Sequence, residues 1–131
     1  MADERRTYAS GTAWEPIVGY SRAVRVGQMI HVSGTTATDA EGRVVGEDDP
    51  ATQTRQVLRN VDTALRALGG ALEHVVRTRI YVVDIVAHWQ IIGAVHGEVF
   101  RDIRPATSMI EVRRLIAPEI LVEIEAEAWV P

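Results

Sequence analysis

The chain has 131 residues, 47% of them hydrophobic, which is enough for one domain with its own core. Its formal net charge is -4 and its 14 basic residues are scattered, so the sequence has no basic stripe of the kind that nucleic-acid binding needs. No apolar run approaches the roughly 20 residues of a membrane span, and the charged start MADERRTYAS has no apolar signal-peptide segment. We therefore expect a cytoplasmic protein with no nucleic-acid or membrane partner.

Two residue types are missing from the sequence. There is no cysteine, which excludes disulfides, a thiolate nucleophile and cysteine-ligated metals. There is no lysine either, because all 14 basic residues are arginine. Arginine stays protonated and forms no Schiff base, so the chain cannot hold pyridoxal phosphate covalently. The four histidines show no metal-binding spacing, and we expect no metal site.

The N-terminal third of the sequence predicts an irregular arm followed by a hairpin. Residues 1–15 show no regular pattern. Val18–Val26 and Met29–Ser33 are typical of two strands, and Gly27-Gln28 forms the tight turn between them.

A polar loop over residues 35–49 leads to the first predicted helix. Asp49 can cap this helix, with Pro50 in its first turn, and Gly69-Gly70 ends it. Its apolar stripe consists of Val57, Leu58, Val61, Ala64, Leu65 and Leu68.

The second half of the sequence predicts three strands and one more helix. The strands cover Val75–Val83, Ser108–Leu115 and Leu121–Val130, and Asp84 can cap the helix that follows the first of them. The element order is β-β-α-β-α-β-β, which indicates a single α+β domain with two helices on one face of a sheet. The expected buried side of the second helix is Ile85, Trp89, Ile92, Val95 and Val99.

The alternation along the last strand predicts what covers the other face of the sheet. Its small and aliphatic residues point towards the helices, whereas Glu123, Glu125, Glu127 and Trp129 point away. Large apolar groups among charges suggest that another chain covers this face, so we expect a closed homo-oligomer. The neighbouring strands are expected to add Arg77, Arg79, Tyr81, Met109, Glu111 and Arg113 to the same face.

Five segments resemble motifs of the Rid family, also called YjgF, of reactive-intermediate deaminases. They are, in chain order, GYSRAVRVGQMIHVSGT, QTRQVLRN, YVVD, RPATSMIEV and LVEIEAEA. The order and spacing of the segments carry the resemblance, which runs from about Tyr20 to Ala128.

The resemblance implies a chorismate-mutase-like fold, similar to the one derived above. In that fold three subunits pack their sheets into a central barrel with the helices outside, and small-molecule clefts lie at the subunit interfaces. Active members hydrolyse imines and enamines of amino acids and use no cofactor or metal. We therefore expect a homotrimer with a small-molecule ligand or substrate.

The resemblance also indicates site residues. A pocket tyrosine corresponds to Tyr20, seven residues before Gly27, and a strand-end pair corresponds to Ser33-Gly34. The other ligand-contacting positions are Thr35, Gly93 and His96, and the carboxylate that orients the attacking water or relays its proton is Glu123.

One position departs from the family pattern. Active deaminases read Pro-Ala-Arg, where the guanidinium holds the substrate carboxylate, but this chain reads Pro105-Ala106-Thr107. We therefore do not infer from the resemblance alone that this chain hydrolyses 2-imino acids as active deaminases do. Arg22, which shares the strand parity of Tyr20, is a candidate for supplying the missing cation from a different strand.

Each candidate position also has a purely structural interpretation. Glu123 could pair with an arginine on the barrel face, and Tyr20 could be an interface aromatic residue. Thr107 could satisfy a backbone group at the start of its strand. Arg22 could form a rim ion pair, and His96 could be a packed, hydrogen-bonded helix residue.

Two function classes follow from the sequence. The first is a divergent, cofactor-independent hydrolase acting on C=N or a related bond. The second is a non-catalytic module that binds a metabolite in the interface clefts and regulates a partner. The retained Tyr20 and Glu123 favour a cleft that still holds a small molecule.

Overall fold

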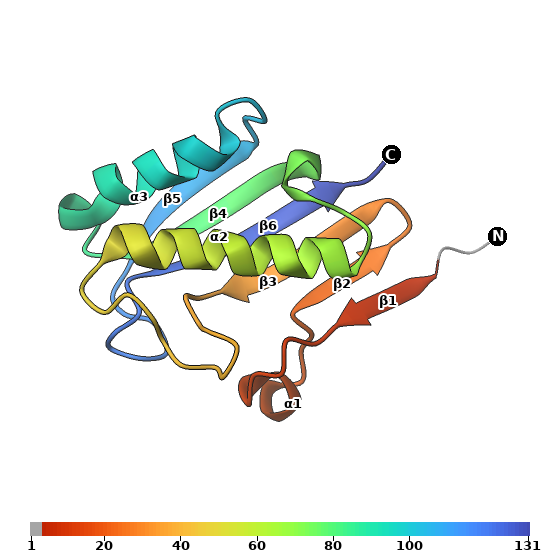
Figure 1. Ribbon diagram of the computed structural model, residues 1–131, viewed down its shortest axis with the longest axis horizontal. Helices are drawn as coiled ribbons and strands as arrows, with labels where there is room; N and C mark the ends of the chain where they lie inside the picture. Colours follow the sequence, from red (N-terminus) through yellow and green to blue (C-terminus); the bar gives the residue numbers. More distant parts are fainter. Residues whose placement is uncertain (1–3) are drawn as a thin grey trace.

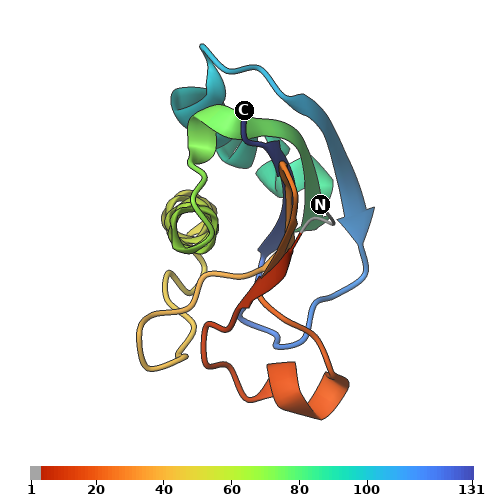
Figure 2. The ribbon, with the colours of Figure 1, turned by 90° about the vertical axis from the view of Figure 1, so that its right-hand side faces the viewer.

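Six strands form one sheet in the order β1-β2-β3-β6-β4-β5, and the two long helices α2 and α3 cover one of its faces (Figures 1 and 2). The structure is a computed structural model that describes residues 4–131. β4 and β5 are parallel, and every other neighbouring pair of strands is antiparallel. The elements are β1 (Arg5–Tyr8), α1 (Trp14–Val18), β2 (Ala23–Val26), β3 (Met29–Thr35), α2 (Pro50–Ala67), a 3-10 turn (Leu72–His74), β4 (Val75–Val83), α3 (Ile85–Phe100), β5 (Ala106–Val112) and β6 (Val122–Trp129).

The core lies between α2, α3 and the sheet, as the sequence pattern predicts. The predicted stripe of α2 is buried along its whole length, and the inward positions of β6 are at most 2% exposed. Both predicted helix caps are confirmed, because Asp49 accepts a hydrogen bond from the Thr52 amide and Asp84 accepts one from the Ala87 amide. The α+β class and the single domain are confirmed.

The prediction of an irregular arm over residues 1–15 is wrong for residues 5–8 and 14–15, whereas residues 9–12 form no helix or strand. Arg5–Tyr8 forms the edge strand β1, which pairs antiparallel with β2. Residues 1–3 of the predicted arm lie outside the described residues. The strand is short and its side chains are largely exposed, so it has no alternation that would have revealed it.

The first predicted strand is also shorter than expected. Trp14–Val18 is the short helix α1, and Gly19 ends it in the left-handed conformation at φ 87°. Extended pairing with β3 begins only at Ala23. The sequence pattern missed this helix because it has only five residues, of which Glu15 alone is buried.

Two predictions about side-chain direction are wrong. Trp89 is 50% exposed on the outer side of α3, and Phe100, which was not predicted, is buried instead. Met109 packs against the core, because it lies opposite the buried Ile80 of β4, and Glu111, opposite the buried Val82, lies on the same side of β5 rather than on the uncovered face. Ile110 is therefore the β5 residue that joins Tyr81 on the uncovered face.

A β-bulge interrupts the pairing of β3 with β6. Val32 lies opposite Ala126 and Thr35 opposite Ile124, so Ser33 and Gly34 together face a single residue of β6. A bulge bends its strand and redirects the side chains around it. This bulge lies at the end of β3 where most of the predicted site residues gather.

In the part of the chain that the structure describes, no helix is both long enough and apolar enough to cross a membrane.

Candidate functional site

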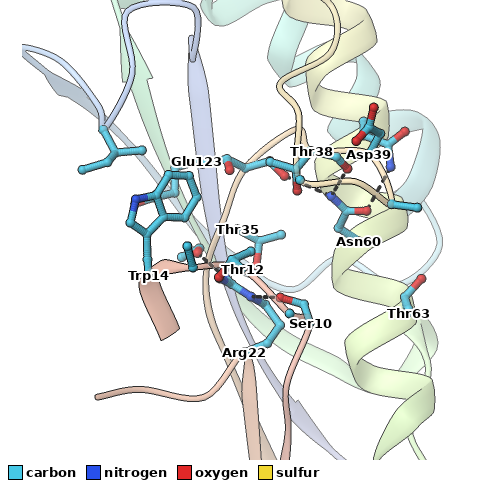
Figure 3. A pocket seen from close by; sticks show the side chains of 18 of the residues that line it. Ser10, Thr12, Trp14, Arg22, Thr35, Thr38, Asp39, Asn60, Thr63 and Glu123 are labelled. Atoms are coloured by element: carbon cyan, nitrogen blue, oxygen red, sulfur yellow. Dashed lines mark hydrogen bonds between the residues drawn. The ribbon is translucent and has the colours of Figure 1, made fainter. Parts of the chain in front are cut away.

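A cavity of about 960 Å³ opens between α1, the end of β3, the loop after β3 and α2 (Figure 3). Trp14 and Glu123 lie on one side of it, and Asn60 and Thr63 of α2 lie on the other. The residues of the predicted site that line it are Tyr20, Arg22, Gly34, Thr35 and Glu123.

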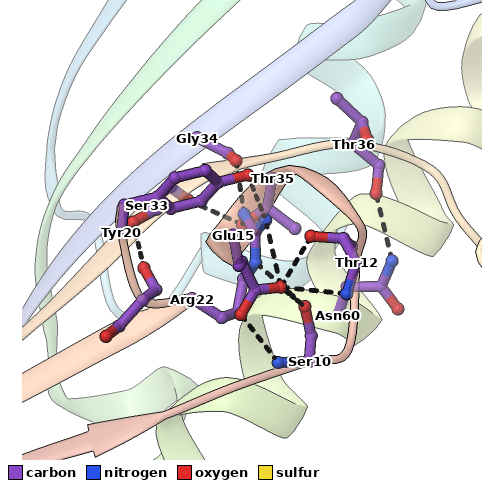
Figure 4. Close-up of polar contacts among 11 residues, drawn as sticks. Ser10, Thr12, Glu15, Tyr20, Arg22, Ser33, Gly34, Thr35, Thr36 and Asn60 are labelled. Carbon is purple, nitrogen blue, oxygen red and sulfur yellow. Dashed lines mark hydrogen bonds and ion pairs between the residues drawn. The ribbon is translucent and has the colours of Figure 1, made fainter. Parts of the chain in front are cut away.

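Behind the residues that line the cavity lies a buried carboxylate, Glu15 of α1, which is 5% exposed. It accepts hydrogen bonds from the backbone amide and the hydroxyl of both Ser10 and Thr12 (Figure 4). Burial alone would raise the pKa of Glu15, but these hydrogen bonds outweigh it and lower the pKa below 4.5. Glu15 is therefore an ionised structural group that folds the segment before α1 around itself.

Arg22 is the cationic partner of this carboxylate. Its guanidinium is 3.9 Å from Glu15 and donates to the Ser10 and Tyr20 hydroxyls at 3.3 Å. It also donates to the Gly34 carbonyl and to the Thr35 hydroxyl (Figure 4). Only 7% of the residue is exposed, and its donors are directed at groups of its own chain.

Glu123 lines the cavity itself, and its carboxylate has different surroundings. In the described part of the chain its carboxylate makes no hydrogen bond, and it projects over the bulge at Gly34. A Cβ added to Gly34 would lie 2.8 Å from Glu123 Oε2, so the carboxylate occupies the space that a side chain there would need. Burial raises the pKa of Glu123, Glu125 adds to the rise, and Arg22 opposes it.

The outer wall of the cavity is held to α2 by one amide side chain. Asn60 Nδ2 donates to the carbonyls of Thr36 and Thr38, both at 3.0 Å (Figure 4 shows the first). Gln56 donates in turn to Asn60 Oδ1 at 2.9 Å. The loop over residues 36–42 is thereby fixed opposite Glu123.

The predicted site residues fall into two groups within one chain. Five of them line the cavity, and Ser33 lies behind it with its hydroxyl donating to the Ser21 carbonyl at 2.7 Å. Gly93, His96 and Thr107 are not part of this cavity. They lie together where α3 crosses β4 and β5.

The second group is joined by a hydroxyl that sequence reasoning missed. Thr78 of β4 is fully buried, and its Oγ1 is 2.9 Å from His96 Nε2 and 2.8 Å from Thr107 Oγ1. Burial lowers the pKa of His96 below 6.5, so its imidazole is neutral at pH 7. Thr107, at the exposed end of this chain of hydroxyls, also donates to the Pro105 carbonyl at 3.2 Å.

Glu15, Trp14 and Asn60 were missed as well, and one of them carried a detectable signal. Thr12 and Glu15 have the Thr-x-x-Glu spacing of a helix capping box, and the Glu15 carboxylate does accept from the Thr12 amide. No comparable local signal marks Trp14 or Asn60, because each joins the cavity only through chain segments remote in sequence. Within residues 4–131, no three histidine, aspartate or glutamate side chains are grouped closely enough to hold a metal ion.

Comparisons with known sequences identify relatives of nearly full length. The family model for Endoribonuclease L-PSP matches residues 10–130. The uncharacterized protein SCO2049 of Streptomyces coelicolor is 35% identical over 127 residues, which are 95% of this chain and 91% of that protein. The RutC family protein PH0854 of Pyrococcus horikoshii is 33% identical over 115 residues, which are 88% of this chain and 90% of that protein.

Solved structures agree with this grouping. Rv2704 of Mycobacterium tuberculosis, described as a member of the YjgF/YER057c/UK114 family, is 50% identical, with a TM-score of 0.87, over 97% of this chain and 100% of that one. A putative endoribonuclease of Thermotoga maritima, TM0215, is 30% identical, with a TM-score of 0.83, over 100% and 98% of the two chains. The chain belongs to the Endoribonuclease L-PSP family, to which the YjgF/Rid proteins also belong.

Proposed function

We propose that this chain binds a small metabolite in clefts between the subunits of a homotrimer and hydrolyses a C=N bond there. The observation that carries the proposal is the carboxylate of Glu123. It faces a cavity, has a raised pKa and has no hydrogen-bond partner in the described chain. A half-buried carboxylate left free beside a cavity is suited to general acid–base chemistry.

The reaction assigned to this site is the addition of water to an imine carbon. The substrate reacts as its protonated iminium form, so the nitrogen already carries one of the protons that it needs. Glu123, as a carboxylate, accepts a proton from the water as the water oxygen bonds to the carbon and the C=N electron pair moves to nitrogen, which gives a neutral carbinolamine. Glu123 then returns this proton to the amine nitrogen, the C–N bond breaks, and the C=O bond forms as the hydroxyl proton passes through Glu123 to the departing ammonia. A raised pKa favours this exchange because it brings the acid and base forms of Glu123 closer to equal population near neutral pH.

Arg22 has a supporting role in this proposal. Its guanidinium already pairs with Glu15 and donates to the Gly34 carbonyl, so we do not assign it to a substrate carboxylate. It instead fixes the bulge over which Glu123 projects. Tyr20 and Thr35, which accept from the same guanidinium, complete the wall of the cavity.

The trimer is supported by the uncovered face of the sheet. Trp129 is 46% exposed and Ile110 is 43% exposed on this face, next to the ion pair of Arg79 with Glu127. Apolar groups between paired charges fit burial by an identical surface. In the trimer we place Gly93, His96 and Thr107 of one subunit opposite the Glu123 cavity of the next. Light scattering of the purified protein tests this, because a monodisperse monomer at micromolar concentration contradicts it.

Metabolite binding without catalysis is the second candidate function. It is favoured by the absence of a free cation in the described cavity, since Arg22 is fully engaged and Thr107 stands where the resemblance leads one to expect arginine. We do not propose ribonuclease activity, because this chain has net charge -4 and its 14 basic residues are scattered along the sequence rather than gathered in a basic stripe.

The deciding experiment is a coupled assay in which an amino-acid oxidase generates carboxylate-bearing imines in place and an amine oxidase generates neutral ones. Carboxylate-bearing and neutral imines are offered to the wild-type protein, to Glu123→Gln and to Glu125→Gln. We expect hydrolysis that Glu123→Gln lowers by about 100-fold or more, the range of a lost general acid–base group. Glu125→Gln is the matched control, because it lies on the same face of β6 and bonds to Tyr81.

Two other outcomes decide against catalysis at Glu123. An equal loss of imine hydrolysis in Glu123→Gln and Glu125→Gln means that the effect on activity is structural. No hydrolysis of any imine by the wild type, together with ligand binding that survives Glu123→Gln, favours the non-catalytic module.

A further inference from the structure

The segment QTRQVLRN of α2 carries polar side chains on the inner side of the helix, where the proposed reaction does not use them. Gln53 and Thr54 are both fully buried. Asn60 follows Gln53 by seven residues, which is nearly two helical turns, so their two amides project in nearly the same direction. A buried amide is costly unless it is hydrogen-bonded, so its partners indicate what it does.

Gln53 bridges the segment just before β6. Its Nε2 donates to the Glu119 carbonyl at 2.7 Å, and its Oε1 accepts from the Leu121 amide at 2.8 Å. Leu121 is held from its other side as well, because its carbonyl accepts from the Val83 amide at the end of β4 at 3.0 Å. Glu123 lies two residues further along the chain, so Gln53 helps to fix the backbone from which the Glu123 side chain projects.

The Gln53 side chain is confined to this bridge. Gly46 packs against it, since a Cβ placed on Gly46 would lie 3.1 Å from Gln53 Cγ. Thr54, its neighbour in the same segment, behaves differently. The Thr54 hydroxyl donates to the Pro50 carbonyl one turn earlier at 2.7 Å, so this hydrogen bond lies within α2. Gln53 therefore joins remote parts of the chain, whereas Thr54 serves its own helix.

Asn60 holds the wall on the other side of the cavity, through the carbonyls of Thr36 and Thr38 (Figure 3). We propose that Gln53 and Asn60 are positioning residues with separate tasks. Gln53 sets the place of Glu123, and Asn60 sets the wall against which the ligand lies. The kinetic consequences of this division rest on the proposed function, because they need the reaction at Glu123.

The first measurement needs no turnover. NMR of the full-length protein, labelled with ¹³C at the glutamate side-chain carboxyl, is recorded across a pH series, and the Glu123 signal is the one missing in Glu123→Gln. Gln53→Met keeps the length of the side chain but removes both hydrogen bonds, so the start of β6 loosens and water reaches Glu123. We expect the raised pKa of Glu123 to fall towards its ordinary value. Asn60→Leu, which alters the other wall, should leave this pKa unchanged.

The second measurement is a split between kcat and KM in the coupled assay. Gln53→Met should lower kcat by about tenfold or more and keep KM within about twofold, because it misplaces the reacting group. Asn60→Leu should raise KM by about tenfold and keep kcat within about twofold, because it disturbs contacts that the substrate makes before and during the reaction. A merely structural role would not divide the two constants in this way.

Thr54→Val is the matched control. It lies in the same segment, is equally buried and also loses a hydrogen bond, but one within α2. It should lower the midpoint of urea denaturation and leave the pKa of Glu123, kcat and KM at their wild-type values.

Gln53→Glu decides the matter if Gln53→Met does not fold. A protonated carboxyl can donate to the Glu119 carbonyl and accept from the Leu121 amide as glutamine does, and burial favours the protonated form. This variant should resemble the wild type at acidic pH. As the introduced carboxyl ionises with rising pH, the Glu123 ¹³C signal should depart from that of the wild type, and an unchanged signal overturns the inference.

The inference is also overturned if a folded Gln53→Met keeps the wild-type pKa of Glu123, if Thr54→Val lowers that pKa equally, or if Gln53→Met and Asn60→Leu change kcat and KM alike. These results are separable from a failure of the proposed hydrolysis. A protein without hydrolytic activity, in which Gln53→Met alone lowers the pKa of Glu123, retains the positioning role and removes the reaction. Hydrolysis that depends on Glu123 but not on Gln53 retains the reaction and removes the positioning role.

Discussion

Glu15 and Glu123 are two glutamates that both lie near Arg22, and the fold gives their carboxylates opposite surroundings. Glu15 accepts hydrogen bonds from two backbone amides and two hydroxyls, has Arg22 as its cation, and has a lowered pKa. Glu123 has no hydrogen-bond partner in the described chain, and burial raises its pKa.

The difference separates a structural carboxylate from one available for chemistry. A buried charge persists when hydrogen bonds and an opposite charge compensate its desolvation. Glu15 meets that condition, so its charge stabilises the fold. Glu123 does not, so it lowers stability when it ionises and keeps both oxygens free for a ligand or a water molecule.

The largest expected effect is on stability, from Glu15→Gln. The amide can no longer accept from all the donors of Ser10 and Thr12, and it leaves Arg22 without its anion. We expect the free energy of unfolding to fall by about 3 kcal/mol, as for a broken buried ion pair. Urea denaturation at a fixed protein concentration measures it.

Glu123→Gln is the matched control, and it should change the free energy of unfolding by no more than about 1 kcal/mol. Equal losses in the two variants would contradict the distinction between the carboxylates.

The next effect is on activity and comes from Gly34→Ala. The new Cβ would lie 2.8 Å from Glu123 Oε2 and 2.9 Å from its Cδ, so the carboxylate must move. Misplacing a reacting group costs rate, and we expect imine hydrolysis to fall by at least about tenfold. The folded state should survive, because the contact is with the end of a flexible side chain. A crystal structure of the variant, together with the coupled assay, shows whether displacement of Glu123 accompanies the loss.

The third prediction is a difference in pH dependence. Because the pKa of Glu15 is lowered, its stabilisation is present above pH 4.5 and is lost as the pH falls through its folded-state pKa. Because the pKa of Glu123 is raised, its destabilisation appears as the pH rises from 4.5 through its folded-state pKa. Relative to wild type, Glu15→Gln should therefore lose stability at pH 7, and this loss should shrink as the pH falls below 4.5, whereas Glu123→Gln should gain stability at pH 7 but not at pH 3.5. Urea denaturation of the three proteins across this range gives the curves, and a Glu123→Gln gain that is independent of pH would contradict the assignment.

The smallest expected effect comes from Tyr81→Phe, on a third carboxylate of the same strand. Tyr81 donates to Glu125 at 2.5 Å, and this hydrogen bond, with burial, raises the pKa of the tyrosine. On a face open to water its loss should cost less than about 1 kcal/mol. Urea denaturation at several protein concentrations measures the loss. A loss of about 2 kcal/mol or more in the free energy of unfolding would mean that a second copy of the chain covers this pair and excludes water from it.

The alternation of β6 and the stripe of α2 were readable from the sequence because burial on one face imposes a period of 2 on a strand and about 3.6 on a helix. The edge strand β1 and the helix α1 were not readable, because both are short and exposed. The error at Met109 has a related cause. β5 is an edge strand whose residues are mostly exposed, so its two faces carry no strong contrast.

The sequence by itself determined the α+β fold, the caps at Asp49 and Asp84, and a set of candidate residues that includes Glu123 and Thr107. Only the tertiary structure decided what those residues can do. Pairing of β3 with β6 through a bulge places Gly34 beneath Glu123, and the chain reversal after α1, at Gly19, is followed by Arg22, which pairs with Glu15. The crossing of α3 over β4 joins His96 to Thr107 through Thr78. Local sequence patterns indicate which residues are buried. The protonation state and the hydrogen bonds of a side chain depend on neighbours that only long-range pairing of the chain supplies.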